Sequence, residues 1–185
     1  MNPEILITLF KYYAKFVPKP VLKSMFKKSS GQIPGYNEIA QEILASPDTY
    51  VIPDIDAFIF SANEGFLSKK IKNSKKTVLY VEYGAFSYSP NQTYGVKEKL
   101  GLHVAQPYSA SNNDNLNEML IMDKMYKILT SILDQMEKDQ KAYDFCGNSK
   151  LIEFPAEVVA IDPPLFHDRT GWMAIFDYST TNIVL

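Results

Sequence analysis

The residues of this chain with the clearest catalytic potential are its two histidines. His167 precedes Asp168, and a carboxylate next to an imidazole can orient it as a general base. Adjacent residues on a turn rarely point together, however, and no nucleophile is identifiable beside this pair. His103 falls on the polar face of a predicted strand. We therefore interpret both histidines as solvated polar residues.

Glu153 and Glu157 are a second acidic pair that could do chemistry, because both fall on one face of a predicted strand. Four residues of strand span roughly 13 Å. This separation exceeds the gap between the paired carboxylates of glycosidases. A solvated strand face is the interpretation that we adopt.

The sequence offers few residues that could form a cofactor or metal site. Cys146 is the only cysteine, so zinc sites built on cysteine pairs are excluded, and two histidines do not favour a histidine-based site. The single cysteine also indicates synthesis in a reducing compartment. No glycine-rich phosphate loop, Gly-x-Ser-x-Gly or His-Glu-x-x-His motif occurs. We predict no catalytic, cofactor-binding or metal residues, and a protein that is not an enzyme.

Charge is unevenly distributed along the 185 residues, whose net charge is −2. Residues 1–30 contain six lysines and one glutamate, a net +5, so the other 155 residues carry −7. A second group of lysines, residues 69–76, could contact phosphate, but no nucleic-acid motif accompanies it, and a solvated loop is the better interpretation. The pattern indicates a basic arm on an acidic body.

The arm, residues 1–30, is predicted to be helical over residues 3–27 and broken at Pro18 and Pro20. Its apolar stripe is too short to be buried alone, so it must pack on the body, on a neighbouring subunit or on a membrane surface. Residues 5–17 are too short, and too interrupted by lysine, to span a bilayer or to act as a signal peptide. We expect a soluble cytoplasmic or particle-borne protein. The candidate subunit contacts in the arm are Leu9, Phe10, Phe16 and Phe26.

The body, residues 31–185, shows the order strand, strand, long helix, strand, strand between residues 77 and 181. We predict strands at 78–88, 96–106, 151–161 and 172–180, and a helix at 116–138 that is capped by Asn115 and Glu118. Residues 55–60 are a further strand or the lead into one. These elements predict an α+β fold in which an antiparallel sheet carries the helix on one face. The helix stripe that should face the sheet is Leu116, Met119, Met122, Met125, Leu129, Ile132 and Met136.

The first of these strands is apolar on both faces. Leu79 and Val81 point one way, and Tyr80, Phe86 and Tyr88 the other. Such a strand is covered on both sides or lies at a subunit contact. Tyr80, Phe86 and Tyr88 therefore join the candidate subunit contacts.

The run from Thr77 to Tyr83, the segment from Lys99 to Val104, the helix start from Asn117 to Leu120 and the ending from Phe176 to Thr181 together form a familiar pattern. Residues 36–181 resemble neck or tail-completion proteins of tailed bacteriophages, in particular phages of gut Bacteroidetes, including crAss-like phages. The resemblance implies a tail-terminator-like α+β fold. It also implies assembly as a ring of six or twelve copies in the virion.

The resemblance further implies partners and a place of work. The partners are further copies of the chain, the portal and other neck or tail proteins, and DNA passes through the ring without specific recognition. Because DNA must slide, we expect the acidic body to line the channel. Two alternatives stay open: an intracellular α+β enzyme or binding protein, and a peripheral membrane protein that uses residues 5–28.

Overall fold

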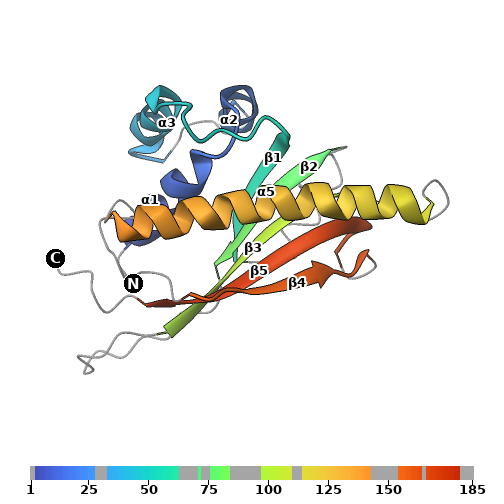
Figure 1. Cartoon of the computed structure of the whole chain (residues 1–185). Helices are drawn as coiled ribbons and strands as arrows, with labels where there is room; N and C mark the ends of the chain where they lie inside the picture. Colours follow the sequence, from blue (N-terminus) through green and yellow to red (C-terminus); the bar gives the residue numbers. More distant parts are fainter. Residues whose placement is uncertain are drawn as a thin grey trace.

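The computed structural model of the chain describes residues 3–27, 33–62, 71, 76–83, 97–109, 114–142, 154–163 and 166–179. These residues form one sheet with helices gathered on one side of it (Figure 1). The strand order is β1-β2-β3-β5-β4. The strands are β1 (Ile55–Ser61), β2 (Thr77–Tyr83), β3 (Lys97–Pro107), β4 (Glu157–Ile161) and β5 (Arg169–Ser179).

The four strands predicted to be antiparallel are so: β2 pairs with β3, β3 with β5, and β5 with β4. The α+β class and the long helix on the sheet are also confirmed. The prediction of a purely antiparallel sheet is wrong, because β1 joins the edge of β2 in parallel. Residues 62–76 connect these two strands, and that connection is long enough for the crossover that parallel pairing requires.

The long helix α5 (Asn115–Lys141) lies across β3 and β5 (Figure 1). Below it, Trp172 donates its indole N–H to the carbonyl of Met122 over 2.9 Å. The predicted cap is wrong by one residue: Asp114 is the N-cap, and its carboxylate accepts the backbone N–H of Asn117 at 2.8 Å. A carboxylate satisfies a free N–H group of the first turn and also favours the positive end of the helix dipole.

The N-terminal arm forms α1 (Pro3–Ala14) and α2 (Lys19–Phe26). The break includes Pro18 as predicted, where Pro18 is the N-cap of α2, but Pro20 lies in the first turn of that helix and does not interrupt it. The arm packs on its own chain. Leu9, Phe16 and Leu22 are buried in the same cluster as Leu79 and Leu129. The backbone N–H of Ile52 also bonds to the carbonyl of Phe16 over 2.9 Å. The arm and the body therefore share one core, to which α3 (Tyr36–Ala45) contributes Ile43.

Strand β2 is buried on both faces within the chain. Leu79 and Val81 face the helix side, whereas Val78 and Tyr80 belong to a second cluster on the opposite side of the sheet. That second cluster also contains Ile59, Ile71, Ala105, Ile161 and Phe166. The two-faced strand is thus a central strand covered on both sides, which is one of the two arrangements that its sequence predicts. In the part of the chain described above, every helix is too short or too polar to cross a membrane.

Candidate functional site

The residues predicted to contact other subunits lie mainly inside the chain. Leu9, Phe16 and Tyr80 are each about 1% exposed. Phe10 is half-buried, and its ring lies 5.2 Å from that of Phe58. Phe26 is half-buried as well, and its ring meets that of Tyr36 at 6.3 Å. Phe86 and Tyr88 lie outside the described residues.

His103 is buried and not on a solvated face, contrary to our interpretation. Its ring stacks parallel on Phe166 with centroids 5.2 Å apart, and the ring of Tyr80 lies 4.8 Å away. Its Nε2 lies 3.4 Å from a carboxylate oxygen of Glu82. Gly101 leaves space for this arrangement, because a Cβ there would meet Nε2 at 2.9 Å. The antiparallel register of β2 and β3, which pairs Tyr80 with His103 and Glu82 with Gly101, brings His103 and Glu82 together.

The remaining histidine and acidic candidates lie in a turn and on an edge strand. His167 and Asp168 occupy a turn in which both residues have positive φ, 54° and 56°. Glu157 is exposed on the edge strand β4, and Glu153 lies outside the described residues. No group of three or more His, Cys, Asp or Glu side chains in the described part of the chain could hold a metal ion.

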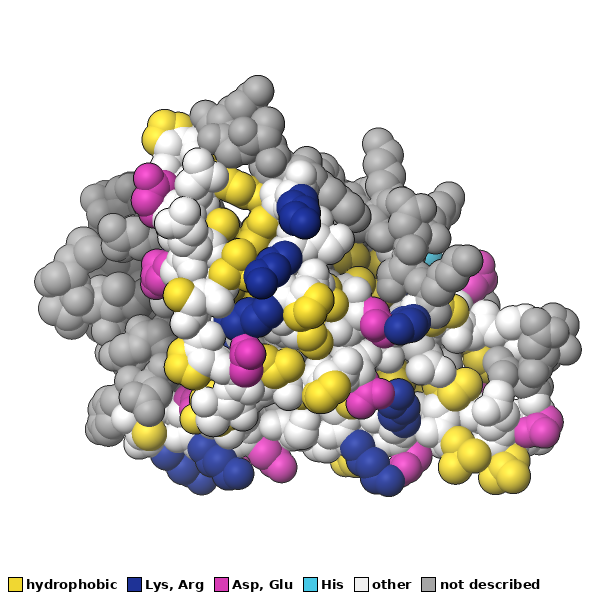
Figure 2. All heavy atoms as spheres, turned by 90° about the horizontal axis from the view of Figure 1, so that it is seen from above, with side chains coloured by type: hydrophobic (Ala, Val, Ile, Leu, Met, Phe, Trp, Pro, Cys, Tyr) yellow, Lys and Arg dark blue, Asp and Glu magenta, His cyan; other side chains and the backbone are white. Residues whose placement is uncertain are grey.

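Three lysines of the arm form ion pairs or hydrogen bonds with other residues of the same chain. Lys11 pairs with Glu42 at 2.6 Å, and Lys15 pairs with Asp139. Lys19 donates to the carbonyl of Ile43 at 2.6 Å. Further along α2, Lys23 and Lys27 are exposed, and neither forms an ion pair within the described ranges. Figure 2 looks down on α2 and α3 and shows a row of dark blue lysine side chains over α2.

Asp139 is the centre of a buried polar contact between α1 and α5. Its carboxylate accepts the hydroxyl of Tyr12 and the side-chain amide of Gln135, both at 2.6 Å, and also pairs with Lys15. Burial alone would raise the pKa of Asp139, but the hydrogen bonds from Lys15, Tyr12 and Gln135 outweigh burial and hold the pKa below its usual value. The arm is therefore fastened to the body by charge as well as by apolar packing.

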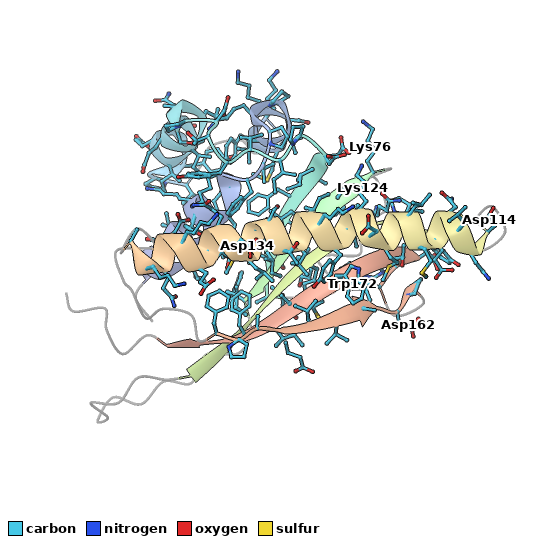
Figure 3. All side chains as sticks on the ribbon, viewed as in Figure 1. Lys76, Asp114, Lys124, Asp134, Asp162 and Trp172 are labelled. Carbon is cyan, nitrogen blue, oxygen red and sulfur yellow. The ribbon has the colours of Figure 1, made fainter. Side chains whose placement is uncertain are left out.

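A polar hollow of about 400 Å³ lies where β1 and β2 begin, β3 ends and α5 passes. Lys124 pairs with Asp54 at 2.5 Å, and Lys76 with Asp56 at 3.3 Å. Figure 3 shows Lys76 and Lys124 near one another above the right half of α5. Thr77 and Gln106 also line the hollow. Because each lysine has an aspartate partner, the hollow carries no net charge from these four groups.

The least expected surface is on the first two turns of α5. Leu116, Met119 and Leu120 are 69%, 59% and 60% exposed, and we call these three side chains the tip patch. The sheet side of α5 is formed by residues further along the helix. These buried apolar residues are Met125, Ile128, Leu129, Ile132 and Met136.

The predicted stripe is thus wrong at its first two residues, Leu116 and Met119, and helix geometry gives the reason. A step of three residues turns the helix by about 300°, so each such step falls about 60° short of a full turn. Leu116 and Met125 are nine residues apart, or about two and a half turns, and lie on opposite sides. The row of Leu116, Met119 and Met122 therefore winds from solvent towards the sheet. Residues four apart differ by only about 40° around the helix. That spacing groups Leu116 with Leu120 on the solvent side, and Met125 with Leu129 on the sheet side.

No known protein family, no curated protein and no solved structure matches this chain.

Proposed function

We propose that this chain is a structural protein of a tailed-phage neck or tail, and that copies of it form a ring joining portal and tail around the DNA channel. The single observation that carries the proposal is the tip patch, in which Leu116, Met119 and Leu120 face away from the sheet. Contiguous apolar side chains of this kind mark interaction surfaces. The sequence resemblance to neck and tail-completion proteins supplies the identity of the assembly.

The described residues form their hydrophobic core within a single subunit. The arm, the sheet and α5 fill one core, and a second cluster covers β2 from the other side. An assembly would therefore use outer surfaces, and the tip patch is one of these. In a closed ring each subunit contacts two neighbours, so no contact surface is left open at the end of the assembly.

The proposal is tested by measuring the mass of the purified chain in solution over a range of concentrations. Native mass spectrometry and negative-stain microscopy should find a discrete ring of six or twelve copies. Purified particles of the phage should hold the same number of copies at the neck or tail. A chain that stays monomeric at high concentration, alone and with its portal, would contradict the proposal.

A second candidate function is binding of a small polar ligand, and the hollow beside Lys76 and Lys124 favours it. A ligand that carries both a cationic and an anionic group could replace the partners within the two ion pairs. Thermal shift measurements with zwitterionic solutes test this function. The expected result is a rise in melting temperature that Lys124→Ala removes and Lys138→Ala, an exposed control on the same helix, leaves intact.

A peripheral membrane role for the arm is not proposed. That role needs the apolar side of α1 at the surface, whereas Leu9, Tyr13 and Ala14 are buried in the core.

A further inference from the structure

The polar hollow between α5 and the start of β1 and β2 has a neutral floor. Val78 pairs with Ala105 in the antiparallel register, so the residues next to them, Thr77 and Gln106, lie side by side. Both line the hollow, and Thr77 is only 3% exposed. Among the described residues, neither of these two side chains has a hydrogen-bond partner. The floor therefore offers a hydroxyl and a carboxamide that can bond to a ligand.

The two ion pairs of the hollow lie next to this neutral floor. Lys124 on α5 contacts Asp54, and Lys76 contacts Asp56. The four side chains are between 33% and 73% exposed, and exposed ion pairs contribute little to stability. Each aspartate can therefore exchange its lysine for the ammonium group of a ligand, and each lysine can exchange its aspartate for a carboxylate. The hollow offers places for a cation and for an anion beside groups that recognise neutral polar atoms.

Hydrogen bonds behind the hollow hold its surroundings in place. The buried guanidinium of Arg169 donates to the carbonyl of Lys76 over 2.9 Å. The indole of Trp172 donates to the carbonyl of Met122, two residues before Lys124 on α5. Figure 3 labels Lys76, Lys124 and Trp172 around this stretch of the helix. Because these contacts form the site before a ligand arrives, binding costs less conformational freedom.

Resting on the second candidate function, we propose that the ligand of the hollow is a free dipeptide in its zwitterionic form. Its ammonium group would meet one of the two aspartates and its carboxylate one of the two lysines, while its amide bonds to Gln106 and Thr77. A carboxamide can donate to the peptide carbonyl and accept from the peptide N–H at the same time. A single amino acid has both charges but no amide between them, and a terminus of a longer chain has only one of the charges. The volume of about 400 Å³ is at the small end of ligand sites, which favours a dipeptide over a longer peptide.

Diglycine and 5-aminopentanoate are the two probes that test the dipeptide with the full chain. Both are zwitterions of the same length, but only diglycine has an amide between its charged groups. Isothermal titration calorimetry should give a dissociation constant for diglycine that is about tenfold lower, as expected from one or two net hydrogen bonds. N-acetyldiglycine lacks the ammonium group and diglycinamide lacks the carboxylate, so both should bind more weakly than diglycine.

Two variants of the floor test the source of this preference. Gln106→Leu removes the carboxamide, and Thr77→Val removes the hydroxyl with little change in shape. Each should weaken binding of diglycine towards that of 5-aminopentanoate and leave the affinity for 5-aminopentanoate unchanged. Gln41→Leu, which alters an exposed glutamine on α3, is the matched control and should change neither affinity. Circular dichroism melts verify folding, and Gln106→Leu decides alone if the buried Thr77→Val misfolds.

The outcomes separate the dipeptide from the functions proposed above. Equal affinities of the unaltered chain for diglycine and 5-aminopentanoate would overturn the dipeptide and leave the binding of zwitterions standing. Binding of N-acetyldiglycine as tight as that of diglycine would also overturn the free dipeptide. Binding of neither zwitterion would overturn the dipeptide and the second candidate function together, whereas ring assembly depends only on the mass measurement.

Discussion

At the scale of single residues, the sheet depends on one close approach of two backbones. Gly171 on β5 has φ of 158°, and a Cβ there would lie 2.0 Å from the carbonyl oxygen of Val104 on β3. No side-chain rearrangement relieves this contact, because both partners are backbone. The centre of the sheet therefore requires glycine at this position.

We predict that Gly171→Ala destabilises the chain by about 3 kcal/mol or more, at the upper end of the usual cost of overpacking. Urea unfolding followed by circular dichroism measures the change. Gly35→Ala is the matched control, since its φ is 82° but nothing lies within 4 Å of an added Cβ. The control should lose only about 1 kcal/mol, the cost of a left-handed backbone. Equal losses would show that the contact with Val104 is relieved by movement of the strands.

Asp139 should make stability depend on acid pH. Its pKa lies below the usual value, so its bonds to Lys15 and Tyr12 contribute stability that is complete above the ordinary carboxylate pKa. This contribution is lost as pH falls through the lower pKa of the folded state. Asp139→Asn should lose about 2 kcal/mol or more at neutral pH, because Lys15 is left partly buried without its partner.

The check on Asp139 is a set of urea titrations between pH 7 and pH 2 for both proteins. The difference between them should shrink as pH falls below the ordinary carboxylate pKa and through the lower pKa of the folded state, where the aspartate of the unaltered chain becomes neutral. A difference that stays constant across this range would rule out the ionised carboxylate as its source.

At the scale of elements, α5 illustrates what periodicity can and cannot predict. Its existence and approximate bounds follow from the sequence, because a long run of apolar and charged residues with helical spacing has few other solutions. Its cap does not follow, because Asp114 and Asn115 are both good capping residues and only the backbone decides between them. Its outer apolar face was not predicted either, because the three-residue spacing of Leu116, Met119 and Met122 resembles a single apolar stripe.

The cap can be tested directly. Asp114→Ala should destabilise the chain by about 1 kcal/mol, because the N–H of Asn117 loses its acceptor. Asn115→Ala should have a much smaller effect, since Asn115 is the first helical residue. Thermal melts of the two variants side by side give the comparison, and a larger loss for Asn115→Ala would move the cap back to the position predicted from sequence.

At the scale of the whole molecule, the sequence predicted the local pairings but not the distant ones. Hairpin neighbours such as β4 and β5 follow from alternation and short connections. The parallel pairing of β1 with β2 depends on the path of a long connection, which no local pattern encodes. The partner of the arm was likewise left open among three surfaces, because Tyr12 meets Asp139 across 127 positions of sequence. His103 was misplaced because its cover includes Phe166, from a different part of the chain.

Removal of the arm should disrupt the subunit itself. A chain that begins at residue 31 loses Leu9, Tyr13, Phe16 and Leu22 from the core and leaves Asp139 without Lys15. We predict loss of cooperative unfolding and rapid proteolysis, as measured by thermal melts and limited trypsin digestion. A cooperatively folded monomer that no longer forms rings would instead indicate that the arm acts in assembly and contributes little to folding.

The contact between Tyr12 and Asp139 also has a consequence for synthesis. The 127 positions between these residues take roughly 6 to 25 seconds to translate at ordinary rates. During that time the apolar side of α1 has left the ribosome, but the helix that will cover it does not yet exist. A chaperone, or the growing chain on a neighbouring ribosome, has access to it throughout. The residues of α1 are thus among the first to be synthesised and among the last to be buried.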